Sequence, residues 1–224
     1  MQAVNAGLEK TMAASPEDAR RDHLWFLESM DRVHRAVQGT HDIDQMMRDV
    51  LDVVLSVLEC DRALLAYPCD PDATSFQIPM RRTRPEFPCE LAPGVEYPVD
   101  DDVVSVYRAS RKQGGPLQLS PESELPVPMR LRRDLGVQSA LVMPVYPKKG
   151  KPYHFVLHQC SHPRIWSPGE KRLFEEIGRR LADGLTTLLM LRDLRQSEAK
   201  LAEQSVADPA RYMATTFPEL SERG

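Results

Sequence analysis

The longest regular pattern of apolar and polar positions in this chain is helical and covers residues 167–204. Ser167, Pro168 and Glu170 supply an N-cap, a first-turn proline and the acid of a capping box. No proline follows until Pro209. The apolar residues after the cap recur at helical spacing: Leu173, Phe174, Ile177, Leu181, Leu185, Leu188 and Leu189. At 1.5 Å per residue such a helix is roughly 50 Å or longer. Because this length exceeds the diameter of one domain, we expect the helix to leave the body of the protein.

The second half of this helix has a different pattern from the first. Charged residues dominate from Arg192 onward, and the remaining leucines form a narrow seam. A narrow leucine seam among charges is typical of a helix that pairs with a second helix. We therefore expect a homodimer, with an interface formed by Leu188, Leu191, Leu194 and Leu201.

Two earlier stretches also predict amphipathic helices. The first runs from Asp18 to Gly39, with Leu24, Leu27, Met30, His34 and Val37 on one face. We expect this face to lie alongside the long helix in the dimer. The second is capped by Asp42, and its apolar positions are Ile43, Met46, Met47, Val50, Leu51, Val54, Leu55 and Leu58. A shorter helix is predicted from Asp101 to about Lys112.

The remaining regular patterns are those of strands. They cover residues 62–67, 75–80, 117–119, 137–145 and 153–160. The order of helices and strands predicts an α+β fold, an antiparallel sheet flanked by helices. We place an N-terminal lead-in at residues 1–17, the domain with its terminal helices at 18–200, and a C-terminal tail or linker at 201–224.

Composition narrows the class of protein. With 224 residues, 42% of them hydrophobic, the chain can fill one core. The net charge of -4 gives no general attraction for nucleic acid or an anionic membrane. No apolar run approaches the length of a membrane span, and the N-terminus lacks a signal-peptide core. We expect a cytoplasmic protein with reduced thiols at Cys60, Cys69, Cys89 and Cys160.

Three segments carry a resemblance to a known family: residues 60–67 (CDRALLAY), 135–144 (LGVQSALVMP) and 157–166 (LHQCSHPRIW). They resemble the GAF domain, and the His-Gln-Cys-Ser and Pro-Arg-x-Trp elements look most like phytochrome-type photoreceptors and related sensor histidine kinases. The resemblance covers about residues 22–200. It implies a six-stranded antiparallel sheet with a ligand pocket on one face, and terminal helices that dimerise. The implied function is a sensory domain that binds an unidentified small molecule and signals to a downstream domain outside this chain.

One feature of the bilin-binding relatives is absent from this sequence. Those relatives have a Cys-His pair shortly before the methionine that precedes the Gly-Val strand start. The corresponding positions here are Val127 and Pro128, with Leu135 in the place of the methionine. Residues 1–59 contain no cysteine that could serve instead. We therefore expect no covalent bilin, and the cofactor is left unassigned.

The predicted pocket combines two strands and an arginine-rich segment. We expect Ser139, Leu141, His158 and Cys160 to share one sheet face, and Arg130 and Arg132 to close the pocket with affinity for an anionic group. His158, Cys160 and His162 alternate on one strand and could also offer metal ligands, but a fourth ligand is lacking. Haem held by His154, His158 or His162 is a further possibility.

Two alternatives to a ligand sensor remain open. The first is a thiol-based redox enzyme resembling the free-methionine sulfoxide reductases, with Cys69, Cys89 or Cys160 as the reacting groups. The second is a GAF domain that has lost its ligand and acts as a dimerisation spacer. The sequence contains no nucleophile-elbow, P-loop, zinc-protease or dinucleotide motif, and we expect no catalytic residues.

Overall fold

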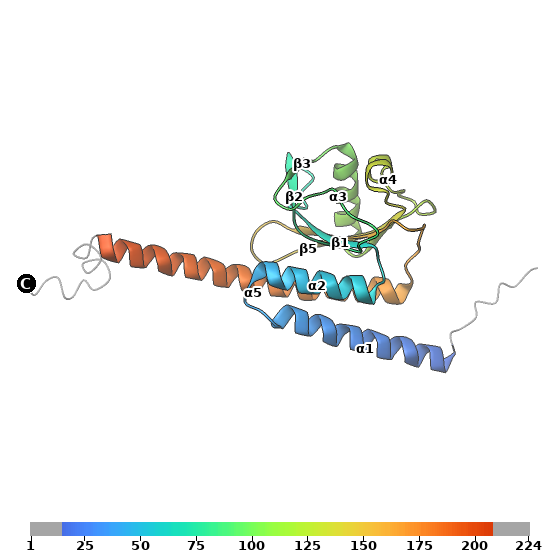
Figure 1. Cartoon of the computed structure of the whole chain (residues 1–224), viewed down its shortest axis with the longest axis horizontal. Coiled ribbons are helices and arrows are strands. Elements are labelled where there is room, and N and C mark those ends of the chain that lie inside the picture. The colour runs from blue at the N-terminus through green and yellow to red at the C-terminus, as the bar shows by residue number, and fades with distance from the viewer. Residues whose placement is uncertain (1–14, 208–224) are drawn as a thin grey trace, which may run out of the picture.

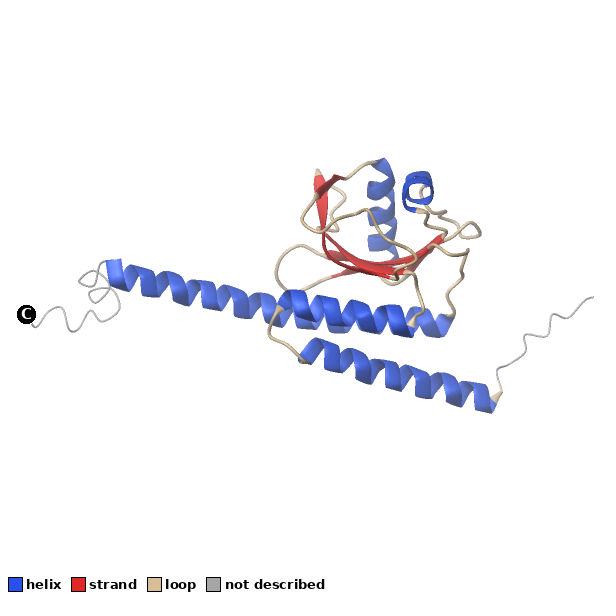
Figure 2. Ribbon diagram, in the orientation of Figure 1, coloured by secondary structure: helices blue, strands red, loops and turns tan. Residues whose placement is uncertain are grey.

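The fold is a six-stranded antiparallel sheet with helices on both of its faces (Figures 1 and 2). The computed structural model describes residues 15–207, with side chains through residue 203. The strand order is β3-β2-β1-β6-β5-β4. The strands are β1 (Arg62–Tyr67), β2 (Ser75–Thr83), β3 (Glu96–Pro98), β4 (Leu117–Leu119), β5 (Ser139–Val145) and β6 (Tyr153–Gln159). The α+β class and the six-stranded antiparallel sheet are therefore confirmed.

One face of the sheet is covered by three long helices, α1 (Pro16–Gln38), α2 (Ile43–Val57) and α5 (Pro168–Ala207) (Figure 1). The carboxylate of Asp42 caps α2 by accepting a hydrogen bond from Gln45 N at 2.7 Å. The apolar side of α2 packs on β1 and β2, α5 packs on β5, and α1 lies outside on α2 and α5. Phe155 of β6 stacks on Phe174 of α5 with ring centroids 4.3 Å apart. This face holds the larger of the two apolar clusters of the described residues.

The other face carries two shorter helices, α3 (Asp101–Gln113) and α4 (Met129–Leu135) (Figure 1). Asp100 caps α3 by accepting from Val103 N at 3.0 Å. Gly114 and Gly136 end α3 and α4 in the left-handed conformation, with φ of 69° and 65°, which glycine adopts without steric cost. The short β3 and α4 were not predicted from the sequence.

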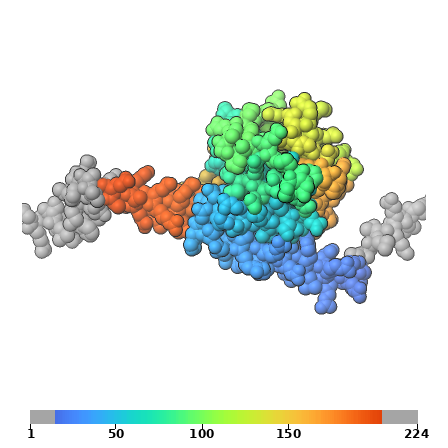
Figure 3. Space-filling view, in the orientation of Figure 1, coloured from blue at the N-terminus to red at the C-terminus, as the bar shows by residue number. Residues whose placement is uncertain are grey.

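Helix α5 begins with the predicted capping box. Ser167 N donates to Glu170 Oε2 at 2.7 Å, and Glu170 N donates to Ser167 Oγ at 3.2 Å. The helix has 40 residues, and its C-terminal part projects beyond the body of the domain, as expected (Figures 1 and 3). Both domain boundaries suggested by the sequence fall inside helices, because α1 begins at Pro16 and α5 runs to Ala207. The outer parts of the proposed lead-in and tail, residues 1–14 and 208–224, lie outside the described residues.

The four leucines assigned to a dimer interface do not share one environment. Leu188 is 5% exposed and belongs to the domain's own core, and Leu191 packs partly against that core. Leu194 and Leu201 are 56% and 52% exposed. The assignment of Leu188 to an intermolecular seam is therefore wrong, because the first half of α5 still covers the sheet at this position. Pairing through Leu194 and Leu201 stays a prediction.

No helix within residues 15–207 is both long enough and apolar enough to cross a lipid bilayer.

Candidate ligand-binding site

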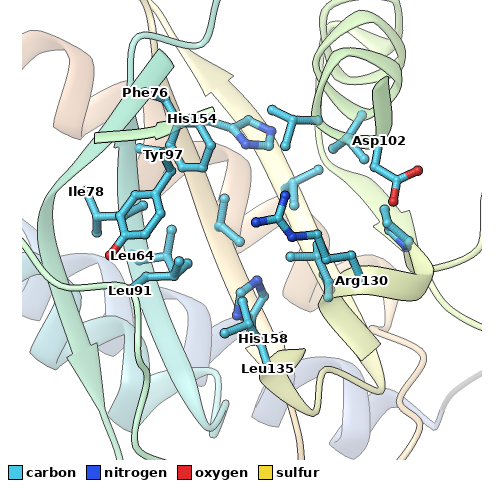
Figure 4. A pocket seen from close by; sticks show the side chains of 18 of the residues that line it. Leu64, Phe76, Ile78, Leu91, Tyr97, Asp102, Arg130, Leu135, His154 and His158 are labelled. Carbon is cyan, nitrogen blue, oxygen red and sulfur yellow. The ribbon is translucent and has the colours of Figure 1, made fainter. Parts of the chain in front are cut away.

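A cavity of about 370 Å³ lies between the sheet and the pair of helices α3 and α4 (Figure 4). This volume is within the range of small-molecule sites. The sheet contributes Leu64, Ala66, Phe76, Ile78, Tyr97, Pro98, Leu119, Ala140, Val142, His154, Val156 and His158, and the helices and loops contribute Glu90, Leu91, Asp100, Asp102, Val103, Val106, Tyr107, Pro128, Arg130, Leu131, Asp134 and Leu135. Apolar side chains dominate the walls, and the charged groups come from the helices and the loop before β3.

The pairing of β5 with β6 decides which side chains reach the cavity. Ala140 is directly opposite His158, and Ser139 is opposite Gln159. Directly opposite residues of an antiparallel pair point to the same face of the sheet, so Ala140 and His158 both line the cavity. Leu141 belongs to the core cluster on the helical face. The prediction that Ser139 and Leu141 share the face of His158 is wrong by one residue of register.

The hydroxyl of Ser139 has a structural partner instead. It accepts a hydrogen bond from Arg164 N at 2.9 Å. Cys160 is partly buried against the apolar cluster on the cavity side but does not line the cavity. Of the strand residues predicted for the pocket, only His158 lies in its wall.

The arginine-rich segment folds into α4 and places one arginine at the cavity. Arg130 lines the wall and forms an ion pair with Asp100, and its Nε lies 3.8 Å from Asp134 Oδ2. Arg132 is exposed and is not part of the wall, so its assignment to the pocket is wrong. Because Arg130 is already paired with carboxylates, the arginines no longer favour an anionic ligand as the sequence suggested. The wall contains four carboxylates, those of Glu90, Asp100, Asp102 and Asp134.

Two histidines of β6 face the cavity and are almost fully buried. His154 is 4% exposed and His158 is 3% exposed. His154 Nε2 and His158 Nδ1 find no hydrogen-bond partner among the described residues. Burial lowers the pKa of each imidazole to about 3, with Arg62 adding to the effect at His158, so both rings are neutral near pH 7. They are buried polar atoms of the cavity wall without a partner, and the Tyr107 hydroxyl and the carboxylates of Glu90 and Asp102 also belong to the wall.

Aromatic rings line one end of the cavity. Phe76 lies 5.7 Å from Tyr97 and 6.5 Å from Tyr107, measured between ring centroids. Tyr107 in turn meets His154 edge to face at 4.9 Å. Figure 4 shows His154 at this end, beside Phe76 and Tyr97, and His158 farther along the strand toward Leu135. The sequence suggested His154 only as a possible haem ligand and did not place Tyr107 at the pocket.

Some residues of the family-like motifs, such as His158 and Ala140, line the site, and others hold it in place. Asp61 Oδ2 accepts from Gln159 Nε2, Cys160 N, Ser161 N and Ser161 Oγ at 2.7 to 3.0 Å. The single carboxylate therefore fixes the His-Gln-Cys-Ser turn at the end of β6. In the Pro-Arg-x-Trp element, Arg164 pairs with Glu170 at 2.6 Å and Trp166 is 1% exposed.

Arg62 fixes the loops around the floor of the cavity. Its guanidinium donates to the carbonyl oxygens of Phe87, Pro88 and Leu135 at 2.9, 2.6 and 2.7 Å. The last of these ties the end of α4 to β1. A buried guanidinium with three carbonyl partners is a positioning element, and only the folded chain brings together residues so far apart in sequence.

The geometry bears on metal binding and on covalent attachment of a bilin. Within residues 15–207, no group of three or more His, Cys, Asp or Glu side chains is arranged to hold a metal ion. His162 is exposed, and its Nδ1 lies 2.9 Å from Ser161 Oγ. Val127 is buried and Pro128 lines the cavity, so the residues at the expected attachment positions do not fit a thioether-linked bilin. The absence of a covalent bilin stays a prediction.

Solved structures similar to this chain include domains of photoreceptors and of a kinase-type sensor. A far-red absorbing dark state with bound biliverdin has a TM-score of 0.60 at 12% identity, covering 71% of this chain and 98% of that chain. The phycoerythrobilin-bound GAF domain of a cyanobacterial phytochrome has a TM-score of 0.58 at 16% identity, covering 78% and 99%. The GAF domain of a protein assigned as a sensor histidine kinase from Pseudomonas syringae pv. tomato has a TM-score of 0.55 at 14% identity, covering 82% and 99%. At these identities the likeness shows the fold alone.

The family follows from the sequence match. The GAF domain family model matches residues 42–185, which is more than half of the chain. The chain therefore belongs to the GAF domain family, and the resemblance expected from its motifs is confirmed. No curated protein matches the chain.

Proposed function

We propose that this chain is a cytoplasmic sensory domain of a signalling protein of the sensor histidine kinase type. It binds a small molecule in the cavity and transmits the bound state through α5 to a downstream domain outside this chain. The fold of the kinase-type neighbour and of the photoreceptor domains supports this proposal. A ligand acts by binding one arrangement of the domain better than another, because only a difference in affinity can shift such an equilibrium.

The observation that carries the proposal is the position of β5 and β6 between the cavity and α5. One face of these strands lines the cavity with Ala140, Val142 and His158. The other face places Leu141, Met143 and Phe155 in the core that contains the first half of α5. The sheet is a single layer, so the same strands contact the cavity on one side and α5 on the other. A ligand that shifts the backbone of these strands therefore changes the packing of α5.

A second link joins the sheet to α5 near the point where the helix leaves the domain. The turn between β5 and β6 reaches α5 through an ion pair of Lys149 with Asp193 and a hydrogen bond from Lys148 N to Thr186 Oγ1 at 3.0 Å. A movement of this hairpin would therefore displace α5 at the start of its projecting part.

Pairing of two chains is part of the proposal. Leu194 and Leu201 are exposed on α5, and Leu24 and Leu27 of α1 are both 50% exposed. Single exposed leucines are ordinary on a surface, but leucines spaced along a projecting helix suit pairing with a second copy. A homodimer would give the two α5 helices a common direction in which to transmit a change.

The thiol-enzyme alternative has less physical support than the sensor. Burial raises the pKa of the Cys60 and Cys69 thiols to about 12 and that of Cys160 to about 11. The thiolate is the reactive form, and it is scarce at neutral pH with such pKa values. Cys89 is also buried.

Native mass spectrometry of the freshly purified full chain, with its absorption spectrum, tests the binding half of this proposal. We expect a non-covalently retained small molecule that is lost in Ala140→Phe, which fills the cavity floor, and kept in the surface control His162→Phe. Retention by both variants would place the ligand elsewhere. Absence of any small molecule under all conditions would favour the spacer.

Transmission is tested separately by electron spin resonance distances between labels at Gln196→Cys in the two chains, an exposed position of α5 outside the leucine seam. We expect the distance distribution to differ between the ligand-bound and ligand-free protein. An unchanged distribution in a protein that binds its ligand would contradict signalling through α5.

A further inference from the structure

The chemistry of the cavity wall defines the kind of molecule that it can take. Two of its buried polar atoms, His154 Nε2 and His158 Nδ1, have no hydrogen-bond partner among the described residues. A buried polar atom without a hydrogen bond raises the free energy of the folded chain, because it has lost its hydration. A molecule that forms a hydrogen bond with each of the two atoms would lower that free energy. The two histidines are four residues apart on one strand face, and their Cα atoms are separated by roughly 13 Å at 3.3 Å per residue. Because both nitrogens are buried, each imidazole must first rotate toward the cavity, and a molecule placed between the two rings can then bond to both.

The remainder of the wall favours an uncharged and flat molecule. Both imidazoles are neutral, and the guanidinium of Arg130 is paired with Asp100 and lies near Asp134. A charged group placed among the apolar residues of the floor would lose its hydration, and the carboxylates of the wall that have no ion pair among the described residues, those of Glu90 and Asp102, are exposed rather than at the floor. The row of rings formed by Phe76, Tyr97, Tyr107 and His154 offers stacking and edge contacts to an aromatic body.

We propose that the cavity binds an uncharged heteroaromatic molecule of one or two fused rings, with a hydrogen-bond donor and an acceptor for the rings of His154 and His158. A neutral imidazole can present either an N–H or a bare nitrogen, depending on its tautomer, so a ligand that has both functions can bond to both rings. This inference rests on the proposed ligand-sensing function. It adds the chemical class of the ligand and the two residues that recognise it.

Four probes of similar size separate the possibilities. 4-Quinolone is uncharged and has an N–H and a carbonyl at opposite ends of one ring. Naphthalene has the same shape without polar atoms, kynurenate adds a carboxylate to the quinolone, and 4-aminoquinoline is a cation at neutral pH. Affinities of the full chain are measured by isothermal titration calorimetry or fluorescence. We expect 4-quinolone to bind roughly 10- to 30-fold tighter than naphthalene, the ratio that two net hydrogen bonds supply. Kynurenate and 4-aminoquinoline are expected to bind at least 10-fold more weakly than 4-quinolone.

The outcomes distinguish this inference from the proposed function. If kynurenate binds most tightly, Arg130 leaves Asp100 to bind an anion. If 4-aminoquinoline binds most tightly, the carboxylates of the wall select a cationic ligand. Equal affinity for naphthalene and 4-quinolone would show that the histidines do not recognise the ligand. In each of these cases the class proposed here is overturned while the cavity remains a binding site. Failure of all four probes to bind would overturn the inference and count against the sensor as well.

Variants assign the recognition to particular rings. His154→Phe and His158→Phe are each expected to weaken 4-quinolone by about 5-fold, the ratio that one net hydrogen bond supplies, and to leave naphthalene binding intact. The preserved naphthalene affinity shows that the cavity of the variant is formed. His162→Phe, outside the cavity, is the matched control and is expected to change neither affinity.

A measurement on the unaltered chain covers the case in which a variant does not fold. Imidazole nitrogen resonances are followed by NMR as 4-quinolone is added, and those of His154 Nε2 and His158 Nδ1 are expected to shift. Binding of 4-quinolone without these shifts would overturn the assignment of the two histidines.

Discussion

The two faces of the sheet are built from the same strands but differ in how completely they are filled. On the helical face, Leu141, Phe155 and Leu157 are 0% exposed and pack against helices whose apolar sides match the sheet. On the opposite face, α3 and α4 leave a cavity of about 370 Å³ and two histidines with unpartnered nitrogens. The packed face stabilises the fold, whereas the cavity face leaves space unfilled and buries two polar atoms without partners among the described residues. The proposed binding of a small molecule requires this difference, because a filled face has no room for one.

The largest expected difference between the faces appears when a leucine is truncated. Leu157→Ala, on β6 toward the helices, should lower the free energy of unfolding by about 2 to 5 kcal/mol, because a cavity is left in a close-packed region. Leu64→Ala, on β1 toward the cavity, should cost about 2 kcal/mol or less, because Leu64 already borders empty space. Urea unfolding gives both values, and equal losses would contradict the contrast between the faces.

The second difference concerns pH. The pKa of His154 and His158 is about 3 in the folded state and about 6.5 in the unfolded chain, so the unfolded state binds more protons between these values. Stability is therefore fully present above about pH 6.5 and falls as the pH drops toward 3. At pH 5 each histidine is expected to cost about 2 kcal/mol relative to pH 7.5.

Urea unfolding at pH 7.5, 6 and 5 measures this dependence. The double variant with His154→Phe and His158→Phe should lose most of it, while His162→Phe, at an exposed position, should behave as the original chain. A pH profile that the double variant leaves unchanged would show that other groups control acid stability.

A third experiment probes the close packing of the helical face. A Cβ at Gly184 of α5 would lie 2.6 Å from Met46 Sδ and 2.8 Å from Val37 Cγ1. Gly184→Ala should therefore destabilise the protein by about 1 to 3 kcal/mol, since α1 and α2 must move away from α5. In Gly169→Ala, the matched control in the first turn of α5, the nearest atom is Ser167 Oγ at 3.9 Å, and the expected change is a gain of about 0.5 to 1 kcal/mol. Thermal unfolding measures the stability of both variants. A Gly184→Ala variant as stable as the original chain would mean that the three helices are more loosely packed than described.

The smallest effect on stability is expected at the projecting end of α5. Leu194→Glu combined with Leu201→Glu alters two exposed side chains and should change the free energy of unfolding of the single chain by no more than about 0.5 kcal/mol. The same pair should convert a dimer to monomers, because a charged seam cannot be buried between two helices. Analytical ultracentrifugation measures the association state, and a double variant that stays dimeric would place the interface elsewhere.

The sequence predicted the local elements well where each has its own signal. The capping box of Ser167 and Glu170 located the start of α5, and the apolar spacing after Asp42 located α2 and its buried side. The two elements that were missed, β3 and α4, are short. The arginines and prolines around residues 81–133 have no periodicity long enough to distinguish a helix of seven residues from a loop.

The composition of the cavity wall depended on the tertiary structure. The sequence shows that residues of β5, and likewise of β6, alternate between two faces of the sheet. It does not show which alternating residues of β5 lie on the same face as His154, Val156 and His158 of β6. The pairing of Ala140 with His158 settles this point, and it removes Ser139 and Leu141 from the cavity. The same is true of the charges, since only the fold brings Asp100 to Arg130.

The sequence by itself determined the family, the α+β class and the long helix that leaves the domain, because motifs, caps and apolar periodicity act over a few neighbouring residues. Only the tertiary structure decided the face on which each strand residue lies, the pairing of Arg130 and the burial of Leu188, because these depend on strand register and on contacts between distant segments. The two unpartnered histidines of the cavity belong to this second group. Their burial and their lack of partners are properties of the folded chain, and no pattern within β6 distinguishes them from ordinary core residues.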